Sequence, residues 1–385
     1  MTRRTRLVPL LLAGTMLAAG CGSAARQSGG PAGPVPPPSL STSLVTTTGT
    51  WAVAVMGGSA AEHDNFWQLF IRPAATGRWR LATPPGVASN GGLVVASPGG
   101  RSVVAGFRPS QDLSFSPLAT THDNGTAWTP GLLDAALADV PDALAAAPDG
   151  GRLLALLASG GAELSGPRGA GWTKLATRQT LAASAAGRQC GPARLTAASF
   201  SPAGAPLLAA SCTHPGTAGI FAYTGGAWHL AGPALPATYA HQGISVLRLT
   251  TTAGTTTALL AVGTGSGAQL LAAWSTGDSG AHWALSRPLP LKGTNPTSAS
   301  SGPGGAVAVV LTGNHAQTIT GPTGAWRPLP ALPPGTATLA PGAGSGWDAL
   351  AVHSTRLTIW QLRAGHAAWA STQTLSVFIQ FGSSG

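Results

Sequence analysis

Apolar positions along this chain form short segments, not long helical stripes. Seven times, a turn rich in Pro and Gly is followed by small and branched apolar residues over roughly the length of one β-strand. These segments are 46–58, 96–107, 146–159, 200–212, 251–263, 300–313 and 339–354. A short apolar run bounded by such turns is typical of a buried strand. The pattern therefore predicts seven buried β-strands at regular intervals.

A tryptophan follows each of these segments. The seven residues are Trp79, Trp128, Trp172, Trp228, Trp283, Trp326 and Trp369, and successive members are 43 to 56 residues apart. Another strand is predicted between the apolar segment and the tryptophan, most clearly at 66–72 and 356–363. Each unit then holds an inner strand, a Pro/Gly turn, a second and a third strand, a Gly-containing turn with the Trp, and a fourth strand. Four antiparallel strands in a repeat of this length are the signature of a propeller blade.

The repeat predicts an all-β fold, a seven-bladed β-propeller of four-stranded antiparallel blades, over residues 43–385. Two fused β-sandwiches would also contain many short strands, but they would not repeat in one sevenfold phase. The composition agrees with many turns, because the chain contains 54 Gly and 32 Pro among 385 residues. Only 8% of the residues are charged.

The first residues read as an export signal. Arginines near the N-terminus precede an apolar stretch, 7–19, that is too short to span a bilayer. The small residues directly before Cys21 resemble the lipobox of bacterial lipoproteins. This resemblance implies a signal peptide over 1–20 and a lipidated Cys21 as the new N-terminus. A plain secretory signal is the alternative. Residues 21–42, rich in Gly, Pro and Ser, are predicted to be a tether.

This leader implies anchoring at the outer face of the bacterial cytoplasmic membrane, or secretion if Cys21 carries no lipid. The formal net charge is +10, but the basic residues are scattered and form no run or aromatic-plus-basic motif. We therefore expect no nucleic-acid partner. The expected partner is an envelope protein or a glycan, with the membrane contacted through the lipid, and the chain is expected to be a monomer.

Two further cysteines, Cys190 and Cys212, flank a predicted hairpin. The segments 193–200 and 206–212 read as strands on either side of a turn near 202–204. A hairpin places its two ends side by side, within disulfide reach, and an oxidising exported setting favours pairing. Two buried free thiols are the alternative reading. A metal site is not expected from two lone cysteines.

Two octets, THDNGTAW at 121–128 and TGDSGAHW at 276–283, resemble the Asp-box, also called the BNR repeat, Ser/Thr-x-Asp-x-Gly-x-x-Trp. This motif occurs in sialidases and many other secreted β-propellers. Its residues here are Thr121, Asp123, Gly125, Trp128, Thr276, Asp278, Gly280 and Trp283. The Asp carboxylate can accept backbone N–H bonds of the turn, Gly permits a positive φ, and Trp covers the hairpin. Both aspartates are therefore predicted to be structural.

The same resemblance implies an alternative function, a sialidase-like glycoside hydrolase. Sialidases have six blades, an Arg-Ile-Pro motif and a Tyr/Glu nucleophile pair, whereas this chain has seven repeats and the order Ile71-Arg72-Pro73. A glycosidase needs two carboxylates facing each other across the sugar. The acidic residues left for such a pair are Glu62, Asp64, Asp112, Asp134, Asp139, Asp142, Asp149, Glu163 and Asp348. The sequence contains no hydrolase or nucleotide-binding motif, and we predict no catalytic residue, metal ligand or cofactor.

Blade topology predicts where a partner binds. The turns between first and second strands and between third and fourth strands share one face of a propeller, here called the turn face. The connections between second and third strands and between blades lie on the opposite face, here called the loop face, and are more varied in sequence. The candidate binding residues on the loop face are His63, Asp64, Arg108, Asp112, Tyr239 and His241. We expect these residues to be exposed and dispensable for stability, in a protein that binds a partner without catalysis.

Overall fold

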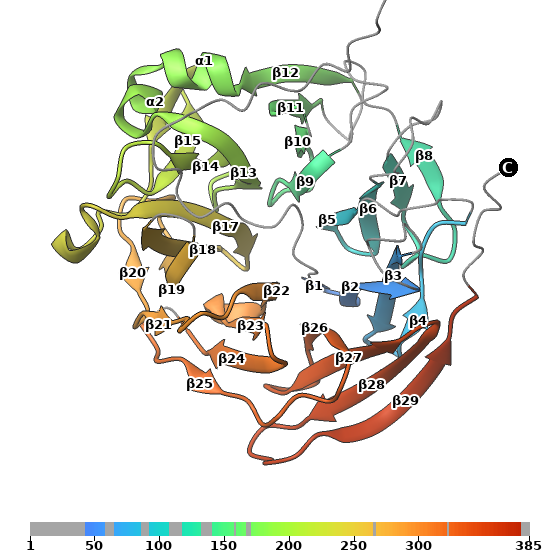
Figure 1. Ribbon diagram of the computed structural model, residues 1–385. Coiled ribbons are helices and arrows are strands. Elements are labelled where there is room, and N and C mark those ends of the chain that lie inside the picture. The colour runs from blue at the N-terminus through green and yellow to red at the C-terminus, as the bar shows by residue number, and fades with distance from the viewer. Residues whose placement is uncertain are drawn as a thin grey trace, which may run out of the picture. The chain divides into compact units, whose positions relative to one another are not determined.

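The structure, a computed structural model, describes residues 43–57, 65–85, 92–107, 118–131, 141–157, 159–166, 171–264, 267–321 and 323–378. All of them belong to one compact unit, Pro31–Gly385. They form seven antiparallel sheets arranged around a ring (Figure 1). The predicted seven-bladed β-propeller is confirmed.

Each blade contains four strands in chain order, from the inner strand outward, and blade 5 has one short additional strand. Blade 1 comprises β1 (Ser43–Thr46), β2 (Gly49–Gly57), β3 (Asn65–Pro73) and β4 (Arg80–Leu81), and blade 2 comprises β5 (Leu93–Gly99), β6 (Ser102–Phe107), β7 (Leu118–Thr121) and β8 (Thr129–Gly131). Blade 3 comprises β9 (Pro141–Ala146), β10 (Leu153–Leu157), β11 (Gly161–Ser165) and β12 (Trp172–Thr177), and blade 4 comprises β13 (Pro192–Phe200), β14 (Pro206–Cys212), β15 (Gly219–Thr224) and β16 (Ala227–Leu230).

The remaining blades follow the same plan. Blade 5 comprises β17 (Gly243–Thr252), β18 (Thr255–Thr264), β19 (Gly267–Thr276), β20 (Ala284–Leu285) and β21 (Leu289–Pro290). Blade 6 comprises β22 (Pro296–Ser301), β23 (Val307–Leu311), β24 (His315–Ile319) and β25 (Arg327–Pro328), and blade 7 comprises β26 (Thr336–Pro341), β27 (Trp347–His353), β28 (Arg356–Leu362) and β29 (Ala370–Ser376). Each repeated tryptophan lies within or directly before the fourth strand of its blade.

Two short helices, which the repeat did not predict, connect blade 3 to blade 4. They are α1 (Arg178–Ala183) and α2 (Ala185–Cys190). The hydroxyl of Thr177 accepts the backbone N–H of Thr180 at the start of α1, and Ser184 caps α2 in the same way. Single 3-10 turns occur at Ala237–Tyr239 and Pro303–Gly305. No helix in the described part of the chain is long and apolar enough to cross a membrane.

The core lies between neighbouring blades. The second strands are buried along most of their length, and β10, β14 and β23 are buried throughout. One apolar cluster joins Leu154 and Leu156 of blade 3 to Phe200, Leu208 and Phe221 of blade 4. Each sheet is covered on both faces by neighbouring blades. The small residues of the second strands allow these sheets to pack closely face to face.

Hydroxyl groups link the inner strands of neighbouring blades. Thr250 of β17 donates to Ser301 of β22 at 3.0 Å, and the hydroxyls of Ser298 and Thr338, on β22 and β26, lie 2.8 Å apart. Ser and Thr therefore suit these inner strands because their short side chains bond across closely packed blades.

The ring closes without exchange of strands between its ends. Every blade consists of consecutive strands, so the last blade meets the first only through side-chain packing and polar contacts. We call this contact between blade 7 and blade 1 the ring seam. Its apolar part joins Ala52 and Phe70 of blade 1 to Ala340, Leu350 and other residues of blade 7.

Contacts between turns support the predicted division into two faces. The hydroxyl of Thr48, in the β1–β2 turn, lies 2.8 Å from the side-chain oxygen of Asn124 and 3.1 Å from the carbonyl oxygen of Gly100 in the β5–β6 turn. Asn124 belongs to the turn of the first octet that resembles an Asp-box, here called the first Asp-box turn. Turns of both kinds therefore meet on the turn face.

Candidate functional site

The first octet that resembles an Asp-box forms a closed turn between β7 and β8. Thr121 donates its hydroxyl to Asp123 at 2.8 Å and accepts the backbone N–H of Gly125 at 2.8 Å. The Asp123 carboxylate accepts the backbone N–H groups of Thr126 and Ala127 at 2.9 to 3.1 Å. The Ala127 bond, followed by the Thr121 bond, lowers the pKa of Asp123. The carboxylate is occupied by its own turn.

The second Asp-box repeats this geometry between β19 and β20. Asp278 accepts the Thr276 hydroxyl at 2.7 Å and the backbone N–H of His282 at 2.9 Å, and Gly280 donates its N–H to Thr276. The His282 ring adds a contact at 2.7 Å. The bonds from the His282 backbone, from Thr276 and from the His282 ring hold the pKa of Asp278 far below its usual range.

Most candidate binding residues on the loop face lie outside the described residues. These are His63, Asp64, Arg108 and Asp112. Of the other two, His241 is exposed in the connection from blade 4 to blade 5. The structure places Tyr239 differently from the prediction.

Tyr239 is a core residue. Only 6% of it is exposed, and its ring belongs to the apolar cluster that contains Ile244, Val246 and Val262. Burial also raises the pKa of its hydroxyl. The expectation that Tyr239 is exposed is wrong, because the 3-10 turn at 237–239 directs this aromatic residue into the space between blades 4 and 5.

The loop face around blade 4 is tied together locally. The ring nitrogen Nδ1 of His214 lies 3.0 Å from the carbonyl oxygen of Gln189 in α2, and the backbone N–H of Gly216 donates to the carbonyl of Gln242. The β14–β15 connection therefore joins α2 on one side to the segment with His241 on the other.

Cys190 and Cys212 form the predicted disulfide, with sulfur atoms 2.02 Å apart. Cys190 ends α2 and Cys212 ends β14, and both are buried. The bond fixes α2 to blade 4 at the loop face.

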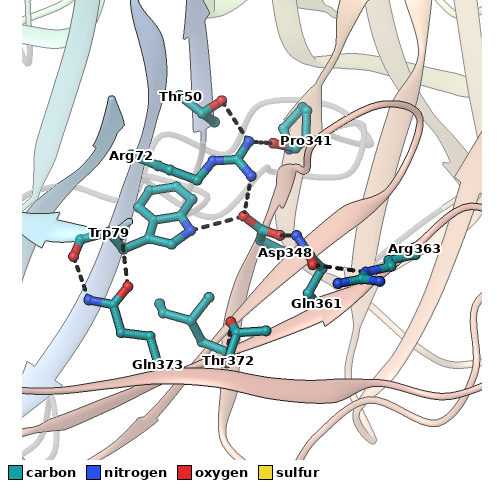
Figure 2. A network of polar contacts seen from close by, with 10 residues as sticks. Thr50, Arg72, Trp79, Pro341, Asp348, Gln361, Arg363, Thr372 and Gln373 are labelled. Atoms are coloured by element: carbon teal, nitrogen blue, oxygen red, sulfur yellow. Dashed lines mark hydrogen bonds and ion pairs between the residues drawn. The ribbon is translucent and has the colours of Figure 1, made fainter. Parts of the chain in front are cut away.

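A network of polar contacts lies at the ring seam, where sequence reasoning predicted no site (Figure 2). Arg72 of β3 and Asp348 of β27 form an ion pair at 2.9 Å, with 11% and 2% of their side chains exposed. Arg72 also donates to the hydroxyl of Thr50 and to the carbonyl of Pro341. Burial raises the pKa of Asp348, and the charge of Arg72 opposes this shift.

Trp79 extends the network to the outer edge of the seam. Its indole N–H donates to Asp348 at 2.9 Å. Its backbone N–H donates to the side-chain oxygen of Gln373, whose amide donates back to the Trp79 carbonyl at 2.7 Å. The side-chain amide of Gln373, on β29, thereby pairs with the Trp79 backbone as the backbone of a neighbouring strand would. The inner part of the ring seam is therefore held by the Arg72–Asp348 ion pair, and its outer part by two hydrogen bonds between the Gln373 side chain and the Trp79 backbone.

The indole N–H of Trp79 has a different kind of acceptor from the corresponding tryptophans of blades 5 and 7. Trp283 and Trp369 donate to backbone carbonyls of the preceding blade, those of Ala231 and Pro330. For Trp79 the preceding blade is the last one in the chain, and the acceptor is a side chain, Asp348. An acidic residue within an otherwise apolar second strand was the available signal, since a buried carboxylate requires a partner.

The described carboxylates are bonded within the fold or buried in it. Asp123 and Asp278 belong to the Asp-box turns, Asp348 pairs with Arg72, and Asp149 accepts the N–H of Gly151. Asp142 lies 3.9 Å from Arg194, and Glu163 is 1% exposed. The other acidic residues, outside the described part, are Glu62, Asp64, Asp112, Asp134 and Asp139. The described residues contain no cluster of His, Cys, Asp and Glu able to hold a metal ion.

No protein-family model and no curated protein sequence matches this chain. Solved structures match it in fold. The β-propeller domain of Cps50 (Swd1) from Myceliophteria thermophila is 11% identical with a TM-score of 0.54, over 84% of this chain and 97% of that chain. A GH74 xyloglucanase from Xanthomonas campestris is 13% identical with a TM-score of 0.52, over 86% of this chain and 52% of that chain. A protein from Lactobacillus plantarum is 9% identical with a TM-score of 0.51, over 86% and 97%. Identities this low show a shared propeller fold alone.

Proposed function

We propose that this chain is an exported, lipid-anchored Asp-box β-propeller that binds a protein or glycan partner at the cell envelope and performs no catalysis. The observation that carries this proposal is that every described carboxylate is bonded within the fold or buried in it. A glycoside hydrolase needs an acid and a second carboxylate on either side of the sugar. Carboxylates that are committed to turns, to a buried ion pair or to a blade interior are not available for that chemistry.

The loop face is the proposed binding surface. Its connections are more varied than the turns opposite, and α2 with the Cys190–Cys212 bond gives part of it a rigid support. Rigid support suits binding, because little conformational entropy is lost when a partner docks.

The test begins with the partner, identified by cross-linking on the cell surface and by a glycan array. The variant His63→Ala/Arg108→Ala/His241→Ala should bind it at least about tenfold more weakly, which corresponds to roughly 1.4 kcal/mol, with an unchanged melting temperature. Tyr239 is retained because it is buried. The control is His122→Ala/Thr126→Ala/His366→Ala on the turn face. If the control variant lost binding and the loop-face variant kept it, the assignment of the surface would be reversed.

Hydrolysis is tested separately. Chromogenic glycosides, including sialosides, should release no product above the protein-free rate. Turnover that disappears in Asp64→Asn or Asp112→Asn, with the fold intact, would replace the binding proposal with a hydrolase.

The lipid anchor rests on the sequence around Cys21. A fatty-acid probe fed to the producing cells should label the wild-type protein and leave Cys21→Ser unlabelled. Release of unlabelled wild-type protein into the medium would show a plain secretory signal.

A further inference from the structure

The outermost strand of blade 7, β29, is an open sheet edge at the rim of the ring (Figure 1). It pairs with β28 on one side, and no other strand of the described residues pairs with it. With seven residues it is also the longest of the outer strands. An open edge presents backbone N–H and C=O groups that can bond to another chain.

β29 lacks the sequence features that commonly protect a sheet edge, namely a very short strand, a charged side chain or a proline. Three other outer strands are longer than two residues, and they contain Pro130, Lys174 and His229. The remaining outer strands have only two residues each. The sequence of β29, ASTQTLS, has no ionisable side chain and no proline. Its edge is therefore the least protected among the described blades.

The backbone of β29 shows which of its groups are open. The N–H of Val377 donates to the carbonyl of Thr355, in the β27–β28 turn, at 2.8 Å. Alternate residues of an antiparallel strand turn their backbone groups to the same side. Thr374 and Ser376 therefore direct their N–H and C=O groups away from β28. A register shift at Thr372 marks the start of this regular stretch.

The side chains of the open residues are exposed as well. Leu375 and Val377 pack into the apolar cluster of the ring seam. Because side chains alternate between the two faces of a strand, Thr374, Ser376 and Phe378 lie on the opposite face, and all three are exposed. Phe378 is 90% exposed, more than any other large apolar side chain of the described residues. This uncharged face combines two hydroxyls with one aromatic ring.

A second copy of the chain suits this edge. In an antiparallel pair of identical strands, each residue that meets another is met by it in turn, so the contact is complementary to itself. β29 carries no charge that would repel its own copy. With a twofold axis at Ser376, the two Ser376 residues face each other. Phe378 of each copy then covers Thr374 of the other, which removes an exposed aromatic ring from water.

We propose that the chain forms a homodimer in which two β29 strands pair antiparallel about Ser376 and join the blade 7 sheets of two copies. This dimer departs from the monomer expected from the sequence, and it goes beyond the proposed function because it does not involve the loop face. Two short strands bury less than the roughly 1,200 Å² of a stable complex. We therefore expect weak association, with a dissociation constant on the order of 100 µM.

Cysteine cross-linking tests the register, in the full chain with Cys21→Ser, which leaves the native disulfide intact. Opposite residues of an antiparallel pair have Cα atoms about 5.5 Å apart, within disulfide reach. Ser376→Cys should therefore form a covalent dimer under mild oxidation. Thr374→Cys alone should not, because the two Thr374 residues lie about 13 Å apart along the paired strands. A mixture of Thr374→Cys and Phe378→Cys should form the mixed dimer.

Sedimentation equilibrium of the same Cys21→Ser chain, from about 10 µM to about 500 µM, gives a second readout and should show a monomer–dimer equilibrium. Ser376→Pro removes an N–H that bonds only across the dimer. It should weaken association at least about tenfold and leave the melting temperature of the monomer nearly unchanged. Ser376→Ala keeps this N–H and should associate as the parent chain does.

A parent chain that stays monomeric at the highest concentration overturns the proposal. Unchanged association of Ser376→Pro, or cross-linking of Thr374→Cys as efficient as that of Ser376→Cys, also overturns it, because either result places the contact elsewhere. The loop-face variant should dimerise normally, so the failure of this proposal and the failure of the proposed function are distinguishable.

Discussion

Asp348 is the one acidic residue in the second strands of the blades, within the described residues, and it meets Arg72 across the ring seam. Removing one member of a buried pair leaves the other charge without compensation, at a cost of about 3–5 kcal/mol. Asp348→Asn should therefore lower the free energy of unfolding by about 3 kcal/mol, as measured by urea denaturation followed by Trp fluorescence.

The matched control removes both charges. Arg72→Met/Asp348→Leu should be less destabilised than Asp348→Asn, because two apolar side chains replace the pair without leaving a buried charge. Wild-type stability in Asp348→Asn would show that the ion pair does not hold the seam.

Asp278 should make the free energy of unfolding depend on pH in the acid range. Its pKa in the folded state lies below its ordinary value of 3.8, chiefly because of the backbone N–H of His282, so the folded protein binds fewer protons here than the unfolded chain. The stabilisation is present above pH 3.8 and is lost as the pH falls below it. Asp278→Asn should show a shallower loss of stability over this acid range in urea denaturation at a series of pH values. An identical acid profile for both proteins would contradict the assigned bonds.

At the scale of elements, the strands were predictable and the helices were not. The spacing from Trp172 to Trp228, 56 residues, is longer than the 43 residues of the last two units. Part of this excess forms α1 and α2. Thr177 and Ser184 were available as cap residues, but helices of six residues bury too little surface to leave a periodic signal. Their stability comes from packing on blade 4 and from the disulfide.

The disulfide closes a segment with a sequence separation of 22 residues. In a Cys21→Ser background, Cys190 and Cys212 should resist alkylation in the native protein until a reductant is added. Cys190→Ser/Cys212→Ser should lose about 3 kcal/mol of stability, because an uncrosslinked unfolded chain has more freedom. Complete alkylation without reductant would exclude the bond.

At the scale of the whole molecule, the number of blades follows from the sequence, but the manner of closure does not. Trp79 and Asp348 are 269 residues apart, and no local pattern relates them. Tyr239 was misplaced for the same reason, because only the packing of blades 4 and 5 decides that its ring is buried. The Asp-box turns were readable because all of their bonds lie within a few residues.

The outer part of the seam depends on Gln373. Gln373→Ala removes both bonds to the Trp79 backbone and should cost about 1–2 kcal/mol. Hydrogen exchange at the Trp79 amide should accelerate by at least about tenfold. Thr374→Ala, an exposed neighbour on β29, should change neither quantity. If the Trp79 amide exchanged at the same rate in Gln373→Ala and in Thr374→Ala, the outer part of the seam would be held by contacts other than those of Gln373.

The assembly of each blade from consecutive strands has a consequence for synthesis. Blade 1 is made first, yet its apolar side at Ala52 and Phe70 is covered only by blade 7, which spans β26 to β29. The apolar side of blade 1 therefore stays exposed in a growing chain until blade 7 has been synthesised. A product that stops before β26 would keep two such exposed sides, one on blade 1 and one on blade 6, and would be prone to self-association and proteolysis. The ring seam between blade 1 and blade 7 can therefore form only after blade 7 has been synthesised.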